Sequence, residues 1–95
     1  MKTIDIKIGD KTAVGYEIQM QNAMLVLVKA EKGFVMCGYL DIKTAEKLGD
    51  AACIVRGVQT VDDLLNAKIV EMTTQAEKFG VKLGITGKEA LEKLS

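Results

Sequence analysis

Two neighbouring segments, Met24-Leu25-Val26-Leu27-Val28 and Phe34-Val35-Met36-Cys37-Gly38-Tyr39-Leu40, decide the fold. Both are apolar at almost every position, and the short loop Glu31-Lys32-Gly33 joins them. In strands with one solvent-exposed face, polar and apolar residues alternate, whereas continuously apolar strands are buried on both faces. We therefore predict that the two segments are adjacent strands at the centre of a β-sheet, with Gly33 available for a positive φ in the turn between them.

The residues before this pair have the two-residue period of half-buried strands. Apolar residues alternate with polar residues or glycine from Ile4 to Ile8 and again from Val14 to Met20. Gly9-Asp10 and Gln21-Asn22-Ala23 supply the turns. This pattern predicts a β-hairpin with one apolar face.

The second half of the chain alternates short helical patterns with short apolar segments. Helix starts are predicted at the capping residues Asp41, Thr60, Thr74 and Thr86, and helix ends at Gly49 and Gly80. Further short strands are predicted over Ala51–Val55, Lys68–Met72 and Val81–Ile85.

The connection from about Met72 to Val81 is shorter than the roughly 10–12 residues that a parallel crossover needs. We therefore predict an α+β fold with an antiparallel or mixed sheet, mainly from the N-terminal half, and short helices packed on one face. A chain of 95 residues is long enough for one domain, residues 1–95, in which residues 1–22 form the N-terminal hairpin.

Composition limits the partners. The formal net charge is zero and Arg56 is the only arginine, so we expect no nucleic-acid binding. No apolar run approaches the roughly 20 residues of a membrane span, and the first residues have no signal-peptide pattern. Two cysteines do not make a disulfide framework. The expectation is a cytoplasmic protein without membrane contact.

The apolar strands predict self-association. Strands that are apolar on both faces need cover on both faces, and helices of about two turns cover only one. If one face of these strands stays exposed to solvent, each large apolar side chain on it costs ~1.5–3 kcal/mol of stability. We therefore predict a homo-oligomer in which the hairpin of residues 1–22 is the assembly region. The alternative is that the hairpin folds over its own sheet as a sandwich or small barrel.

Cys37 is the first candidate for chemistry, as a nucleophile with open space beside it at Gly38. Nucleophilic cysteines usually depend on a histidine or a helix N-terminus, and the chain has no histidine. The simpler interpretation is a small apolar residue within a strand, and it also applies to Cys53. Two thiols without histidine fall short of a zinc site, so neither a metal nor a cofactor is expected.

Arg56 is the second candidate. It directly follows a buried apolar segment and precedes Gly57, and strand ends of this kind carry ligand-binding groups in α/β proteins. A guanidinium there can hold a carboxylate or phosphate, with Asp50 as a candidate partner. The simpler interpretation is an ion pair or an exposed side chain.

The chain also resembles a known family. The segments Met36-Cys37-Gly38-Tyr39 and Gly49-Asp50-Ala51-Ala52, with Val55-Arg56-Gly57-Val58, are similar to those of the YunC-like proteins, domain of unknown function family 1805. The resemblance extends from about Val14 to Leu94. It implies tetramer formation through an N-terminal β region and implies no activity. The recurring segments hold the site candidates Cys37, Gly38, Asp50, Arg56 and Gly57.

Three functions follow as hypotheses. The first is a non-catalytic, homotetrameric module that binds a small anionic ligand near Arg56 at a subunit interface. The second is a thiol-dependent enzyme that uses Cys37, with Arg56 orienting a carboxylate. The third is a structural subunit of a larger complex.

Overall fold

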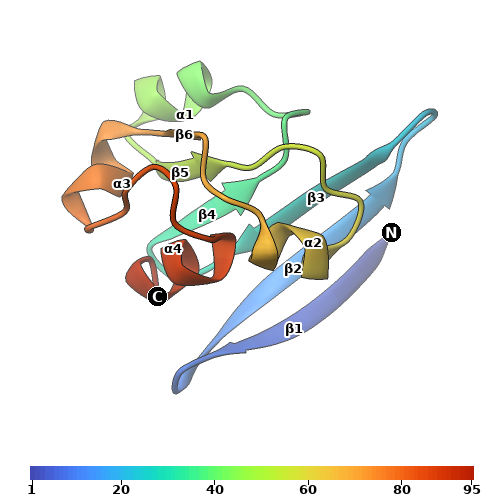
Figure 1. The fold of residues 1–95 in the computed structure, drawn as a ribbon, viewed down its shortest axis with the longest axis horizontal. Helices are drawn as coiled ribbons and strands as arrows, with labels where there is room; N and C mark the ends of the chain where they lie inside the picture. The colour runs from blue at the N-terminus through green and yellow to red at the C-terminus, as the bar shows by residue number, and fades with distance from the viewer.

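Six strands form one mixed sheet in the order β1-β2-β3-β4-β5-β6 in the computed structural model, which describes residues 1–95 (Figure 1). The strands are β1 (Lys2–Ile8), β2 (Lys11–Gln19), β3 (Met24–Lys29), β4 (Gly33–Met36), β5 (Ala51–Ile54) and β6 (Glu71–Met72). The helices are α1 (Ile42–Leu48), α2 (Val61–Asn66), α3 (Thr74–Lys78) and α4 (Gly87–Lys93). All neighbouring strands are antiparallel except β4 and β5, which are parallel. The predicted α+β fold with a mixed sheet is confirmed.

The helices begin where local capping chemistry starts them. The carboxylate of Asp41 accepts a hydrogen bond from the Lys43 N–H at α1, and Thr86 forms a complete capping box with Glu89 at α4. Gly49 ends α1 with φ 81°, which glycine adopts without strain. The prediction that Thr74 caps α3 is wrong by one residue, because the hydroxyl of Thr73 caps this helix.

Two of the predicted strands are too long and a third does not form. β4 ends at Met36 because the chain turns there, and the Leu40 N–H donates to the Cys37 carbonyl. Of Lys68–Met72 only β6 remains as a strand. Val81–Ile85 forms no strand, and the next residue, Thr86, makes only a single bridge to Lys68.

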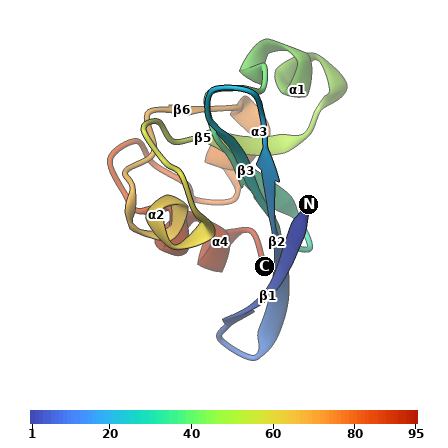
Figure 2. The same cartoon turned by 90° about the vertical axis from the view of Figure 1, so that its right-hand side faces the viewer.

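The helices divide between the two faces of the sheet, as the side view shows (Figure 2). Residues of α2, α3 and α4 join the larger core on the inner face, which includes Val26, Val35, Leu64 and Leu91. The remaining helix, α1, packs on the outer face. The short helices pack on the sheet as predicted, and the expected single face holds for α2, α3 and α4, whereas α1 packs on the second face.

The prediction of one apolar face for the N-terminal hairpin is wrong, because the register separates the apolar sets of β1 and β2. Ile4 lies opposite Gly15 and Ile6 opposite Ala13, on the inner face. Val14, on the outer face, lies opposite Asp5 of β1. Directly opposite residues share a face, so β1 turns its isoleucines inward while the large apolar residues of β2 point outward.

The outer face of the sheet is covered over only part of its width. α1 covers the outward side chains of β4 and β5 by packing against Met36, Ala52 and Ile54. Over β2, β3 and the start of β4 the register leaves an apolar strip that we call the outer patch. Its half-buried residues are Val14, Tyr16, Ile18, Leu27 and Phe34.

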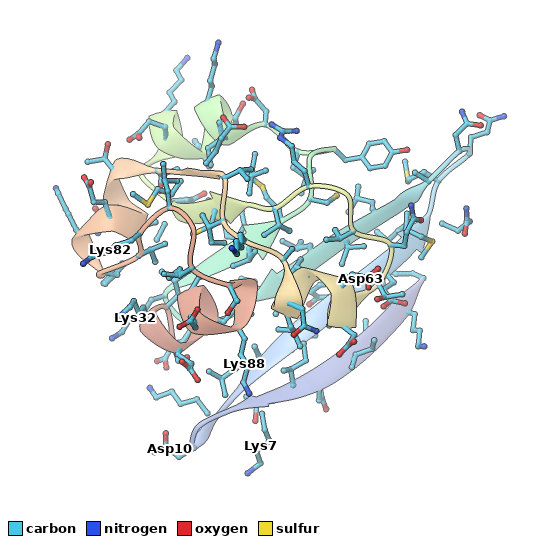
Figure 3. The ribbon with its side chains drawn as sticks, viewed as in Figure 1. Lys7, Asp10, Lys32, Asp63, Lys82 and Lys88 are labelled. Atoms are coloured by element: carbon cyan, nitrogen blue, oxygen red, sulfur yellow. The ribbon has the colours of Figure 1, made fainter.

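Charged side chains are spread over much of the surface. Several point outward from separate parts of the chain, among them Lys7, Asp10, Lys32, Asp63, Lys82 and Lys88 (Figure 3). None of the four helices has both the length and the apolar character needed to cross a bilayer.

Thr73 ties the C-terminal half of the chain to β5. Its side chain is almost completely buried, and its hydroxyl donates to the Asp50 carbonyl at 2.7 Å. The same oxygen accepts the N–H groups of Ala52 and Ala76, at 3.0 and 3.3 Å. One hydroxyl therefore satisfies polar groups of β5 and α3 that would otherwise be buried without partners.

We expect Thr73→Val to lower the free energy of unfolding by at least about 1–3 kcal/mol, because it leaves buried backbone groups unpaired. Thr73→Ser keeps the hydroxyl and is expected to cost only about 1 kcal/mol for the lost methyl group. Urea denaturation of the two variants measures the difference. A valine variant as stable as the serine variant would contradict this role.

Candidate functional site

The parallel pairing of β4 with β5 brings Gly38 and Arg56 together. Met36 lies opposite Ile54, and the Val55 N–H donates to the Met36 carbonyl at 3.0 Å, which extends the pairing beyond both strands. Gly38 and Arg56 follow on their respective segments, at the carboxyl ends of the two strands. Ligand-binding groups of open α/β sheets lie at such ends.

A shallow cavity of about 290 Å³ lies at this edge of the sheet. Its lining consists of Gly38, Tyr39, Arg56 and Gly57, and we call it the Arg56 pocket. Gly38, Arg56 and Gly57 are thus three predicted site residues that the fold brings together. Tyr39, whose side chain is 50% exposed, was not predicted.

The absence of a side chain at Gly38 leaves space for the guanidinium of Arg56. A Cβ atom at this position would lie 2.6 Å from Nη1 of Arg56, so any side chain would have to displace the guanidinium. Gly57 has φ 75°, which turns the chain directly after Arg56 in a conformation that glycine adopts at little cost. Both glycines therefore position Arg56 without contributing a functional group.

The partner of Arg56 is Glu71, the first residue of β6. Nη2 of Arg56 donates to Oε2 of Glu71 at 2.5 Å, and this is the one hydrogen bond that the guanidinium makes. The side chains are 56% and 42% exposed, so the pair contributes about 0–1 kcal/mol to stability. A guanidinium has five N–H donors, and the others remain available for a ligand.

Asp50 lies away from the Arg56 pocket. It precedes β5 whereas Arg56 follows it, and six residues of extended chain span ~20 Å. The Asp50 side chain lines a different cavity of about 290 Å³, between α1 and the outer face of β4. It is not the partner of Arg56.

Cys37 and Arg56 lie on opposite faces of the sheet. Cys37 is 4% exposed and packs in the inner core, where its sulfur accepts the Val26 N–H at 3.3 Å. Arg56 is two residues beyond Ile54, whose side chain points outward beneath α1. The fold therefore separates the thiol from the guanidinium.

Cys53 is fully buried in the same core, and this burial raises the pKa of its thiol to about 12. It lies opposite Val35, so Cys37 is two residues out of register with it. A diagonal pair across strands is wider than the Cβ separation of a disulfide, and both cysteines are free. No group of three or more acidic or cysteine side chains is arranged to hold a metal ion.

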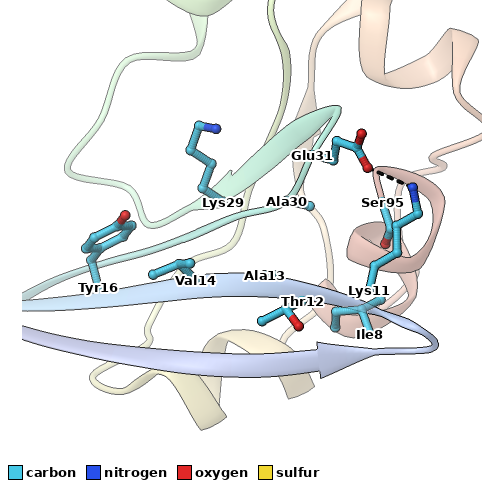
Figure 4. A pocket seen from close by; sticks show the side chains of 10 residues that line it. All are labelled: Ile8, Lys11, Thr12, Ala13, Val14, Tyr16, Lys29, Ala30, Glu31 and Ser95. Atoms are coloured by element: carbon cyan, nitrogen blue, oxygen red, sulfur yellow. Dashed lines mark hydrogen bonds and ion pairs between the residues drawn. The ribbon is translucent and has the colours of Figure 1, made fainter.

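A larger cavity of about 390 Å³ lies where β2 separates from the end of β3 (Figure 4). None of the predicted site residues lines it. Across this cavity Nζ of Lys11 lies 2.7 Å from Oε2 of Glu31, and this hydrogen bond lowers the pKa of the Glu31 carboxyl. The two charges are therefore already paired with each other.

Sequence reasoning also missed a buried carboxylate. Glu17 is 9% exposed on the inner face of β2, and its Oε2 accepts the N–H of Val61 at the start of α2, at 2.7 Å. The alternating pattern of β2 predicts that this residue faces water. Its role depends on the β1–β2 register, which has no signal in the sequence of β2 alone.

Comparison with known proteins gives a consistent result. Residues 36–94 match the family model "Domain of unknown function (DUF1805)". The chain is 38% identical over 87 residues to the uncharacterized protein YunC of Bacillus subtilis, which covers 87% of this chain and 84% of YunC. Its fold is similar to the crystal structure of a protein of unknown function, TA1206 from Thermoplasma acidophilum. That match has a TM-score of 0.94 and 39% identity, over 99% of this chain and 92% of that chain.

The burial of both thiols predicts slow chemical labelling. With a disulfide reagent at about pH 8, near the ordinary thiol pKa, neither Cys37 nor Cys53 should react faster than the protein unfolds. Cys53→Ala leaves Cys37 as the single thiol, and it should react as slowly as in the wild type. Rapid labelling of this variant under native conditions would contradict a purely structural Cys37.

Proposed function

The chain belongs to the DUF1805 family, and on that premise we propose that it is a non-catalytic, self-associating cytoplasmic module whose Arg56 pocket binds the anionic group of a small ligand. The supporting observation is a half-exposed guanidinium with one protein partner at the edge of an open cavity. Planar guanidinium groups hold carboxylates and phosphates through paired N–H donors.

The surroundings of Arg56 suit binding better than catalysis. Gly38 and Gly57 offer backbone rather than reactive side chains. Tyr39 adds a hydroxyl and an aromatic surface. A thiol-dependent reaction is disfavoured, because Cys37 is buried in the inner core and faces away from Arg56.

We further propose that a second copy of the chain covers the outer patch. The patch combines large apolar side chains from β2, β3 and β4. Leu27 and Phe34 pack beside the cluster under α1, and the patch continues beyond it over β2. Burying each such side chain contributes about 1.5–3 kcal/mol, which favours association. A tetramer is the assembly that the resemblance to the YunC-like proteins implies. The Cys37 N–H donates to the Val26 carbonyl near the start of β3, so the Arg56 pocket lies toward the end of the outer patch at Ile18, which pairs with Leu25.

Anion binding should appear as thermal stabilisation. For a single exposed arginine we expect a Kd of about 1 mM. A ligand concentration ten times this Kd then adds about 1.4 kcal/mol to the free energy of unfolding. That raises the melting temperature of a chain of this size by roughly 5–10 °C. We expect this shift with inorganic phosphate or a small carboxylate, its loss in Arg56→Gln and its persistence in Lys47→Gln, an exposed control on α1. No shift with any of these anions, or a shift that survives Arg56→Gln, would refute the proposed site.

Light scattering after gel filtration tests the assembly. The wild type should elute as a particle of four 10.3 kDa chains, and Tyr16→Glu should dissociate it by placing a charge in the outer patch. Val70→Glu is the matched control, because Val70 is an exposed apolar residue outside the patch. A wild type that is monomeric at micromolar concentration would overturn self-association and favour a structural partner of different sequence.

A further inference from the structure

The charge of Arg56 is already balanced by a fixed counter-ion. The carboxylate of Glu71 contacts Nη2, and both side chains remain partly exposed to solvent. Glu71 also pairs through its backbone with Ile54, two residues before Arg56, so the counter-ion is held beside the pocket by the sheet itself. A simple anion that enters the pocket is attracted by Arg56 and repelled by Glu71.

Coulomb interactions fall off only with the inverse of distance. A ligand anion bound to Arg56 is only about one hydrogen-bond length farther from Glu71 than Arg56 is, so Glu71 still repels it. A ligand that adds only negative charge therefore binds more weakly than one that also satisfies Glu71. A ligand that also carries a positive group can place it against Glu71 and satisfy both charges.

The two ends of the guanidinium face different neighbours. Nη1 lies over Gly38, which lines the pocket, whereas Nη2 meets Glu71. A donor edge and an acceptor carboxylate are thus presented side by side. In an α-amino acid the carboxylate and the ammonium group are separated by one carbon atom, which suits two charged groups that lie in hydrogen-bond contact.

We infer that the Arg56 pocket selects a zwitterionic ligand of the α-amino acid class, with Arg56 binding its carboxylate and Glu71 binding its ammonium group. This inference rests on the anion-binding function proposed above and specifies the ligand class for the same site. The cavity of about 290 Å³ beside Tyr39 leaves room for a small side chain. Glu71 is then a specificity-determining residue that discriminates against simple anions.

The test compares L-alanine with L-lactate, which has a hydroxyl in place of the ammonium group, by isothermal titration at constant ionic strength and neutral pH. For the wild type we expect L-alanine to bind about three- to fivefold more tightly, which is the effect of an exposed ion pair worth up to about 1 kcal/mol. Glu71→Gln keeps an oxygen that accepts from Arg56 but removes the charge. This substitution should bring the ratio of the L-lactate Kd to the L-alanine Kd to about one, chiefly by improving the affinity for L-lactate.

Two controls separate the possible failures. Glu77→Gln removes an exposed carboxylate from α3 and should keep the wild-type preference. A wild type that binds L-lactate as tightly as L-alanine, or a preference that survives Glu71→Gln, overturns the zwitterion inference and leaves anion binding intact. If Arg56→Gln binds both compounds as the wild type does, or if the wild type binds neither, the proposed function itself fails and the inference fails with it.

Discussion

The parallel pairing of β4 with β5 is the constraint on which the rest of the structure depends. It holds Gly33 so close to Ala51 that a Cβ at Gly33 would overlap the Ala51 carbonyl oxygen. A parallel pair needs a crossover, and the crossover here contains α1, so this helix packs on one face of the sheet, which is the outer face. The same register carries Gly38 and Arg56 to one edge of the sheet. The proposed ligand site and the position of α1 thus have one structural cause.

A second constraint, the register of the β1–β2 hairpin, explains why the outer face is incompletely covered. The two-residue turn at Gly9 and Asp10 pairs Ile8 with Lys11, and this choice fixes the face of every later residue. The inner face of β2 receives the small residues Ala13 and Gly15, and Val61 of α2 packs closely against Gly15. The large apolar residues of β2 must then point outward, where no helix of the chain lies over them.

Much of the fold could be predicted from the sequence, because local chemistry determined it. Asp41, Thr60 and Thr86 start helices through side-chain hydrogen bonds that need no tertiary contact. The failures have tertiary causes. Thr73 rather than Thr74 caps α3 because its hydroxyl also binds β5, and Gly33 is required for close strand packing rather than for a positive φ. These roles depend on residues more than fifteen positions away.

The site was predictable in part. Arg56, Gly57 and Gly38 stood out as a lone cation and glycines at strand ends, and the fold assembles them. Glu71 carries no local signal, since its role arises only when β6 pairs beside β5. Asp50 was a candidate partner of Arg56 because the two residues are close in sequence, but the length of β5 separates them. Extended chain moves residues apart about twice as fast as helix does, so proximity in sequence misleads most at strands.

Because Arg56 is the only arginine, its side-chain Nε–H gives a single arginine signal in a ¹⁵N-edited NMR spectrum. Following this signal during a titration with L-alanine tests most directly whether the β4–β5 pairing builds a ligand site. We predict that the Arg56 side-chain signal and the backbone amides of Gly38 and Gly57 shift together and saturate, while the amide of Asp50 does not move. Shifts that centre on Asp50, or an Arg56 signal that does not move, would contradict the account.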